Sequence, residues 1–283
     1  MSLYAYEEDL LLYAAEAEPR RVYACAGCGG KVRVRKGPSR VPHFYHLSRA
    51  PACRLYSKSE DHLLAQLALQ KILPAGEAVL EKPFPEILRI ADVAWEKRKI
   101  IFEIQCSLVS PKEVEQRIDD YKNMGYQIVW ILDDRIFNRR KVRPAERLLR
   151  VNACYYATLR KGLPFFYDQF ELFYQETRVK RGYSLKVQIG RPLLLPPFNW
   201  EKERFPSQIL QKTERTNLYF LGDLIYKALL SETNPAVAFS MQNLCALERF
   251  YAKEIRRESL VKKIVTRLIL EPWGRLVLFL LKP

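Results

Sequence analysis

Two carboxylates in neighbouring strand-like segments carry the strongest chemical signal in the sequence. Asp92 lies in the segment 89–96, and Glu103 lies in the segment 99–107. A tight turn between these segments would bring the two side chains directly opposite each other on paired strands. Like charges in that position destabilise a sheet, unless a cation lies between them. Oxygen ligands suit Mg²⁺ or Mn²⁺, and such an ion can activate water to hydrolyse a phosphodiester, so the pattern predicts a metal-dependent nuclease.

The expected register of this hairpin follows from its turn. If the turn is centred on Lys97-Arg98, then Ala94 pairs with Ile101. Side chains alternate along a strand, so Glu103 and Gln105 point to the same face. The simpler alternative is an exposed hairpin edge that carries scattered acids.

A second group of reactive side chains lies near the N-terminus. Cys25 and Cys28 have the C-x2-C spacing that can hold one zinc ion. His43, His46 and Cys53 compete for the two remaining ligand positions. A thiolate ligand favours Cys53, and His46 is preferred over His43 because it lies nearer Cys53 in the sequence. In a reducing compartment such a cluster predicts a structural Zn²⁺ site rather than disulfides, and the alternative is free thiols beside core histidines.

The elements that must position these residues can be read from periodicity. Residues 1–58 form short strands in a basic module with little core of its own, which a metal would help to fold. Apolar residues at helical spacing predict an amphipathic helix over 59–73. Ser110 is the expected N-cap of a second helix with a capping box, and Gly125 its expected terminator. The apolar run 126–132 suits a strand buried on both faces.

From the residues alone, the part of the chain from 59 to 150 therefore has the order helix, strand, strand, helix, strand. Its last segment, 135–150, carries seven basic residues and one acid and is expected to be a linker and basic patch. Residues 151–283 begin with strands and turns and become helical from about 206 to 270. The aromatic runs Tyr155-Tyr156 and Phe165-Phe166-Tyr167 are either core residues or platforms for unpaired bases.

The charge of the chain favours a polyanionic partner. The 47 Lys and Arg residues exceed the 32 Asp and Glu residues, which gives a formal net charge of +15. Basic residues concentrate in 31–58, 135–150 and 249–267. In the last run, a helix would present a basic stripe or simply a solvated face, made by Lys253, Arg256, Arg257, Lys263 and Arg267. Phosphate contacts carry no sequence information, so we expect salt-sensitive DNA binding of low sequence specificity.

No segment is predicted to cross a membrane. The longest apolar run near the C-terminus is Leu276–Leu281, which is far shorter than the ~20 residues that span a bilayer. Acidic residues precede any basic residue at the N-terminus, unlike in a signal peptide. We therefore expect a cytoplasmic protein without membrane insertion.

The order of elements, with an acid in the first strand and Glu-x-polar in the second, resembles the restriction-endonuclease-like core of PD-(D/E)XK nucleases. That core has the order αβββαβ. The matching positions are Asp92, Glu103 and Gln105, of which the last is usually Lys. Gln can orient water or substrate but supplies no positive charge. The resemblance to RecB-like members implies that His62, on the preceding helix, contacts the metal, and Glu60 is near enough in sequence to reach the same site.

The next helix carries a further resemblance. Arg117 and Tyr121 have the spacing of the RecB-like QxxxY motif, with Arg in place of Gln. Both residues are expected to bind substrate. The guanidinium of Arg117 would clamp a phosphate. A surface salt bridge from Arg117 to Asp119 or Asp120 is an equally good interpretation.

Together these motifs resemble the CoiA-like competence protein family. The resemblance covers about residues 1–135 and rests on Tyr23-x-Cys25-x-x-Cys28, His43-Phe-x-His46, Ser59-Glu60-x-His62, Ile90-Ala-Asp92-Val93, Glu103-Ile-Gln105-x-Ser107, Arg117-x-x-x-Tyr121 and Val129-Trp130-Ile131. The expected fold is of mixed α+β and α/β class. It has a zinc-ribbon-like module at 1–58, a PD-(D/E)XK nuclease-like core at 59–150, and a mixed, DNA-binding part at 151–283 that ends in helices.

The family implies a nuclease of DNA uptake and recombination during natural transformation. Its expected cofactors are structural Zn²⁺ and catalytic Mg²⁺ or Mn²⁺. Its expected partners are DNA and other recombination proteins. One alternative is a catalytically weak DNA-binding accessory protein that retains the nuclease fold, and a second is a scaffold that binds only proteins.

Overall fold

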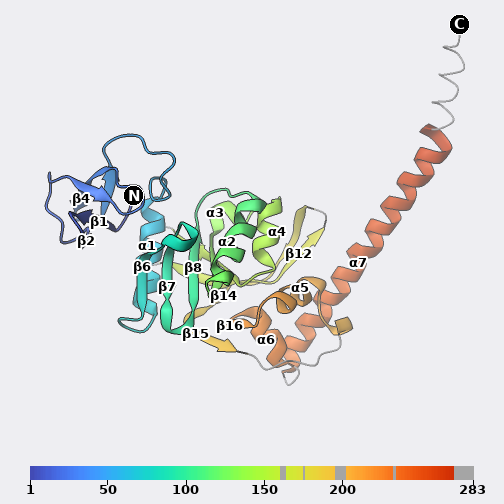
Figure 1. The fold of residues 1–283 in the computed structure, drawn as a ribbon. Coiled ribbons are helices and arrows are strands. Elements are labelled where there is room, and N and C mark those ends of the chain that lie inside the picture. The colour runs from blue at the N-terminus through green and yellow to red at the C-terminus, as the bar shows by residue number, and fades with distance from the viewer. Residues whose placement is uncertain (160–163, 175, 195–201, 232–233, 271–283) are drawn as a thin grey trace, which may run out of the picture.

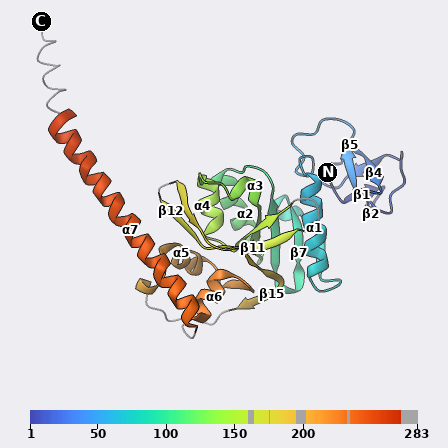
Figure 2. The same cartoon turned by 180° about the vertical axis from the view of Figure 1, so that it is seen from behind.

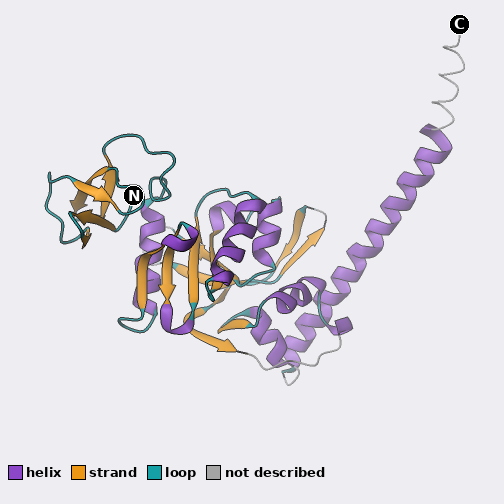
Figure 3. Cartoon of the chain, viewed as in Figure 1, coloured by secondary structure: helices purple, strands orange, loops and turns teal. Residues whose placement is uncertain are grey.

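The described residues of this computed structural model are 1–159, 164–174, 176–194, 202–231 and 234–270. They form a small N-terminal sheet, a larger sheet covered by helices, and a long C-terminal helix that extends away from the body (Figures 1 and 2). Helices and strands alternate through the large sheet region (Figure 3), so the fold is of mixed α and β class, as the sequence predicts.

The N-terminal module is an antiparallel sheet of five strands in the order β2-β1-β3-β4-β5. Its strands are β1 (Tyr4–Glu7), β2 (Leu10–Tyr13), β3 (Tyr23–Cys25), β4 (Lys31–Gly37) and β5 (Arg40–His46). In β4 the side chains of Val32 and Val34 are buried and the alternating basic residues Lys31, Arg33 and Arg35 are exposed, which is the expected period of two. The core of this module is small, so a bound metal would add to its stability.

The central sheet has seven strands in the order β14-β11-β10-β9-β8-β7-β6. These strands are β6 (Ala78–Phe84), β7 (Arg89–Trp95), β8 (Ile100–Gln105), β9 (Gln127–Asp133), β10 (Cys154–Thr158), β11 (Phe165–Asp168) and β14 (Leu185–Lys186). β9 runs parallel to both β8 and β10 and is almost wholly buried, in agreement with its continuous apolar run.

Helices cover both faces of this sheet. Leu63 and Leu69 of α1 (Glu60–Ile72) share one core with Phe102 of β8. The opposite core contains apolar residues of α2 (Pro111–Asn123), α3 (Asp134–Phe137) and α4 (Pro144–Arg150). β15 (Gln188–Leu194) pairs with β16 (Leu218–Leu221), and both add apolar residues to the core on the α1 side.

The helix ends follow the sequence signals in most respects. Ser59 and Ser110 are the N-caps of α1 and α2, and Gly125 follows α2 with a φ of 77°. The capping box of α2 is only half formed. Oγ of Ser110 accepts the N–H of Glu113, but the carboxylate of Glu113 pairs instead with Arg89 and Arg117.

Several elements differ from the sequence-based expectation. The sequence pattern does not predict β6, because Glu81, Lys82 and Pro83 interrupt the apolar alternation. The segment 135–150 is no linker, since it forms α3 and α4 and buries Ala145 and Leu149 against the sheet. The sheet also continues past residue 150, because β10 pairs with β9 in parallel.

The C-terminal part contains the hairpin β12 (Glu171–Tyr174) and β13 (Thr177–Arg181), followed by α5 (Ser207–Arg215), α6 (Leu224–Leu230) and α7 (Pro235–Val265). β16 interrupts the region that was expected to be wholly helical. Tyr155, Tyr156, Phe166 and Tyr167 are buried in the core, which excludes them as open platforms for bases. Within the described ranges, every helix is too short or too polar to cross a bilayer, and the run Leu276–Leu281 lies outside those ranges.

Candidate active site and metal cluster

The two acids of the hairpin lie where β7 and β8 separate. The strands pair in the expected register, with Ala94 opposite Ile101. The ladder ends one pair further on, just before Asp92 and Glu103 would face each other. There Oδ2 of Asp92 accepts the main-chain N–H of Ile104 at 2.9 Å, a donor that the ladder no longer uses. The end of strand pairing therefore opens space beside both carboxylates while it holds Asp92 in place.

Asp92 is buried and surrounded by positive or polar donors. Its Oδ1 lies 2.9 Å from Nε2 of His62 and 2.8 Å from Nζ of Lys58. Burial by itself would raise the pKa of Asp92, but the attraction of His62 and Lys58 more than reverses this effect, so the pKa lies well below its usual value. Asp92 is thus ionised at neutral pH. The resemblance to RecB-like nucleases implies that His62 contacts a metal. In the structure His62 lies beside the carboxylate of Asp92.

Glu103 is held by two residues of α2. The hydroxyl of Tyr121 donates to Oε1 at 2.8 Å, and Nη1 of Arg117 donates to Oε2 at 2.9 Å. Burial, and then the negative charge of Asp92, raise the pKa of Glu103 to about 7. Two neighbouring acids therefore have very different pKa values, an arrangement that is common at functional sites.

The structure changes the roles expected for Arg117 and Tyr121. Arg117 does not pair with Asp119 or Asp120, because its guanidinium lies between Glu103 and Glu113. Tyr121 is 1% exposed and lies behind the carboxylate of Glu103, where it cannot stack on a substrate. Both residues orient Glu103, and only the partly exposed Arg117 is still accessible to a substrate phosphate.

Gln105 and Glu60 complete the set of site residues predicted from the sequence. Gln105 lines the same cleft as Glu103, and its Nε2 donates to the carbonyl of Ser107 at 2.7 Å. Glu60 points elsewhere, because its Oε1 accepts the N–H of Val41 at 3.1 Å in the N-terminal module. The expectation that Glu60 shares the site with His62 is wrong. These neighbours at the start of α1 point in different directions.

A cleft of about 390 Å³ is lined by His62, Asp92, Glu103 and Gln105. Basic residues from three segments of the chain also line it. Its cations are Arg54, Lys58, Arg89 and Arg117. Arg89 pairs with Glu113 and Asp120. Arg54 has no acidic partner within the part of the chain that the structure describes. Burial, and then the repulsion of Arg89, lower the pKa of Arg54, while the charge of Glu113 acts in the opposite direction.

Arg54 and Lys58 were not identified individually as site residues. They belong to the basic run 31–58, whose members look alike in sequence. For Lys58 the signal is its position directly before the segment Ser59-Glu60-x-His62. Only the path of the chain from the N-terminal module to α1 brings them into the cleft.

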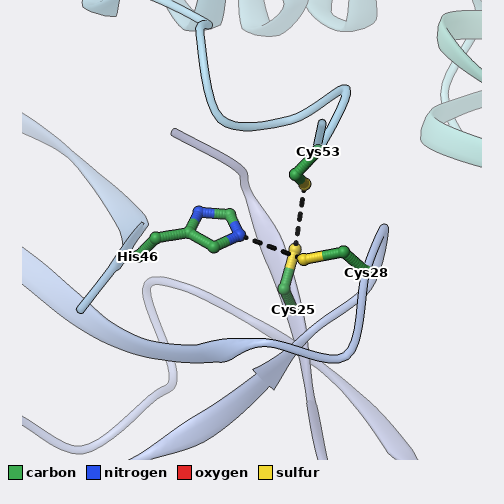
Figure 4. A group of neighbouring side chains, drawn as sticks. All are labelled: Cys25, Cys28, His46 and Cys53. Carbon is green, nitrogen blue, oxygen red and sulfur yellow. Dashed lines mark hydrogen bonds between the residues drawn. The ribbon is translucent and has the colours of Figure 1, made fainter. Parts of the chain in front are cut away.

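Figure 4 shows that the side chains of the four predicted zinc ligands point toward one another. The ligand atoms of Cys25, Cys28, His46 and Cys53 all lie within 4.8 Å of one another. The Sγ atoms of Cys25 and Cys53 are 3.7 Å apart. Zinc–sulfur bonds of ~2.3 Å in a tetrahedral site separate two sulfurs by about 3.8 Å, so the spacing fits one zinc ion.

His46, and not His43, provides the nitrogen of this cluster. Nε2 of His46 lies 3.3 Å from Sγ of Cys28, whereas the ring of His43 is buried and its Nδ1 contacts the carbonyl of Val41 at 2.8 Å. Burial raises the pKa of Cys25 to about 12, so a cation is needed to stabilise its thiolate. The cluster can therefore hold a metal such as zinc. Within the described ranges, no comparable group of ligand atoms occurs elsewhere, including around Asp92 and Glu103.

The fold and these two sites define a protein that joins a cysteine–histidine module to a nuclease-like domain. Two family models match the chain: "Competence protein CoiA, nuclease-like domain" over residues 58–178 and "Competence protein CoiA, N-terminal domain" over residues 13–56. Together they cover more than half of the sequence, so the chain belongs to the CoiA-like competence protein family. The nuclease-like match ends beyond residue 150, as the central sheet does.

One curated relative is Competence protein CoiA of Bacillus subtilis (strain 168). It is 28% identical over 118 residues, which are 40% of this chain and 32% of the relative. The matched segment thus spans about a third of that relative. No solved structure matches the chain.

Proposed function

We propose that this protein is a Mg²⁺- or Mn²⁺-dependent deoxyribonuclease that acts on DNA during competence and recombination, with low sequence specificity. The observation that supports it best is the pair of buried acids, Asp92 and Glu103, in a basic cleft where two strands separate. The order α1-β6-β7-β8-α2-β9 is the αβββαβ order of the PD-(D/E)XK core, which favours a fold of that type.

The donor chemistry of the two acids fits a small divalent ion. An ionised carboxylate offers about four acceptor sites. Asp92 uses three of them for Lys58, His62 and Ile104, and Glu103 uses two for Tyr121 and Arg117. Oxygen sites therefore remain for one Mg²⁺ or Mn²⁺ that keeps several waters. When bound, the ion would polarise the phosphoryl group and lower the pKa of water.

The residues of the chain then have distinct tasks. Arg54 and Arg117 bind phosphate at the cleft, and Tyr121 and Arg117 hold Glu103 in position. Gln105 orients the segment after β8 through Ser107. In hydrolysis, the water oxygen forms a bond to phosphorus and gives up a proton to solvent, the bond from phosphorus to the leaving sugar oxygen breaks, and the leaving oxygen takes up a proton from solvent.

We assign the cysteine–histidine cluster to structural Zn²⁺. Its four protein ligands would leave no open coordination position, and structural zinc sites are closed in this way. This assignment is independent of nuclease activity.

A second function is favoured by position 105. The PD-(D/E)XK pattern usually has a lysine there, and this chain has Gln105 with its amide bound to Ser107. A protein with weak catalysis that binds DNA and assists recombination would retain every other feature of the cleft.

A cleavage assay separates the two functions. Linear, circular, single-stranded and branched DNA are incubated with Mg²⁺ or Mn²⁺ and with the wild type, Asp92→Asn or the control Asp119→Asn, in which an exposed acid of α2 is changed. The proposal predicts cleavage by the wild type and the control only. DNA binding without cleavage of any substrate would favour the accessory function.

A further inference from the structure

Lys58 is a buried cation at the base of the cleft. Its side chain is only 8% exposed, and its Nζ lies 2.8 Å from Oδ1 of Asp92 and 3.1 Å from Oε1 of Glu81. An ammonium is costly to bury, and such lysines are paired with acids. Of the three N–H donors, these acids take two within the described part of the chain, which leaves one for an atom in the cleft.

The cleft lacks a lysine at the place where the PD-(D/E)XK pattern usually has one. Gln105 carries no charge, and its amide is bound to Ser107. Lys58 reaches the same cleft from a different element, the segment that leads into α1, and contacts the first acid of the pattern. We infer that Lys58 supplies the positive charge that Gln105 cannot, and that it contacts the substrate phosphate beside Asp92. This inference rests on the proposed nuclease function.

The N-terminal module holds this lysine in position. Cys53 of the metal cluster lies five residues before Lys58. Between them, the α-amino group of Met1 donates to the carbonyl of Leu55 at 2.7 Å. Glu81, which pairs with Lys58, also accepts the main-chain N–H of Leu3 at 2.9 Å. Cys53 of the metal cluster and the contact between Glu81 and Leu3 therefore hold the segment that carries Lys58, which gives the module a role in the chemistry of the cleft.

A simpler role for Lys58 is to neutralise two buried acids without contacting substrate. The two roles make different predictions for second substitutions. If Lys58 only neutralises acids, then Glu81→Gln should compensate for Lys58→Met, because it removes an acid that the first change leaves unpaired. If Lys58 supplies charge to the substrate, then Gln105→Lys should compensate, because it returns a cation to the cleft.

The experiment compares full-length wild type with Lys58→Met, Lys58→Met/Gln105→Lys and Lys58→Met/Glu81→Gln. The matched control is Lys71→Met, which changes an exposed lysine at the other end of α1. Single-turnover DNA cleavage is measured with Mn²⁺, oligonucleotide binding with Ca²⁺, and folding by thermal melting. Lys58→Met/Glu81→Gln guards against loss of folding, because it retains the charge balance of the buried pair.

We expect Lys58→Met to slow cleavage by about 100-fold or more, the usual effect of losing a charge-stabilising group. Adding Gln105→Lys should raise the cleavage rate of Lys58→Met by at least about tenfold. Adding Glu81→Gln should restore the melting temperature but not the cleavage rate. A rate within threefold of wild type in Lys58→Met, or full restoration by Glu81→Gln, would overturn the inference.

If the wild type cleaves no DNA, the nuclease proposal fails and the binding measurement decides on Lys58. If Lys58→Met/Glu81→Gln binds the oligonucleotide more weakly than Lys71→Met, and the further change Gln105→Lys restores binding, then Lys58 contacts the phosphate. Binding equal to that of Lys71→Met would exclude it.

Discussion

Oδ2 of Asp92 accepts a hydrogen bond from the main-chain N–H of Ile104 over 2.9 Å, across the gap where β7 and β8 cease to pair. This bond joins a side chain of one strand to the main chain of the other. It allows the strands to separate without leaving a buried donor unsatisfied. The cleft beside Asp92 and Glu103 lies where the strands separate.

Removal of either acid should abolish cleavage and leave DNA binding intact. Asp92→Asn or Glu103→Gln removes an oxygen ligand of the proposed ion, which is expected to slow cleavage about 1000-fold or more, since the charge stabilisation by a metal is worth several kcal/mol. Binding should be unchanged or slightly tighter, because a negative charge near phosphate is lost. Cleavage rates and anisotropy titrations measure the two effects. Loss of binding in step with cleavage would indicate that the acids are needed for folding instead.

Divalent-ion binding should depend on the ionisation of Glu103. The pKa of Glu103 is about 7, so a metal must displace a proton from it below that pH. Affinity for Mn²⁺ should therefore fall by about tenfold for each pH unit below the pKa and level off above it. Calorimetric titrations across this range check the prediction. The same dependence in Glu103→Gln would show that another group is responsible.

The stability of the protein without an ion at Asp92 and Glu103 should change with pH in the same window. The pKa of Glu103 is raised from 4.5 to about 7 by folding, so the folded state binds more protons than the unfolded state between these values. The contribution of Glu103 to the free energy of unfolding is therefore full below about pH 4.5 and is lost as the pH rises through 7. Denaturant unfolding of wild type and Glu103→Gln, in buffer without added Mg²⁺ or Mn²⁺ and with zinc bound at the cysteine–histidine cluster, should give curves that diverge across this interval. Parallel curves would contradict the prediction.

One tightly bound Zn²⁺ per chain is expected at the cysteine–histidine cluster. Cys25→Ser/Cys28→Ser and His46→Ala should each lower zinc content, whereas His43→Ala should retain it, because its ring lies outside the cluster. Elemental analysis of protein purified without added metal measures this difference. Full zinc occupancy in the double cysteine variant would exclude the assignment.

DNA affinity should fall steeply with salt, and Arg54 should contribute to it. Each phosphate contact made by a cation adds about one unit to the slope of log affinity against log salt. Arg54→Ala should lower that slope by about one unit, while the matched change Arg40→Ala, at an exposed position of β5, should leave it unchanged. Titrations at several salt concentrations give the slopes. Equal slopes in wild type and Arg54→Ala would place the DNA elsewhere.

Much of the local structure follows from short-range patterns in the sequence. The caps Ser59 and Ser110, the left-handed Gly125 and the register that pairs Ala94 with Ile101 all depend on neighbours within a few residues. The same holds for the knuckle that begins the metal cluster. β6 does not follow from short-range patterns, because its residue Glu81 is buried by contacts with a distant part of the chain. Glu81 accepts the main-chain N–H of Leu3.

Residue types and their spacing identify the side chains that can do chemistry: two acids on paired strands, a Cys-x2-Cys pair with histidines nearby, and an excess of positive charge. The partners of these side chains depend on the folded chain. In the folded chain Glu60 accepts a hydrogen bond from Val41, and Arg117 pairs with Glu103. Lys58 pairs with Asp92 and Glu81. A long polar side chain pairs with whichever groups lie in the distant segments that bury it. Its burial arises from the packing of whole helices and strands, and the spacing of residues along one strand or helix does not predict it.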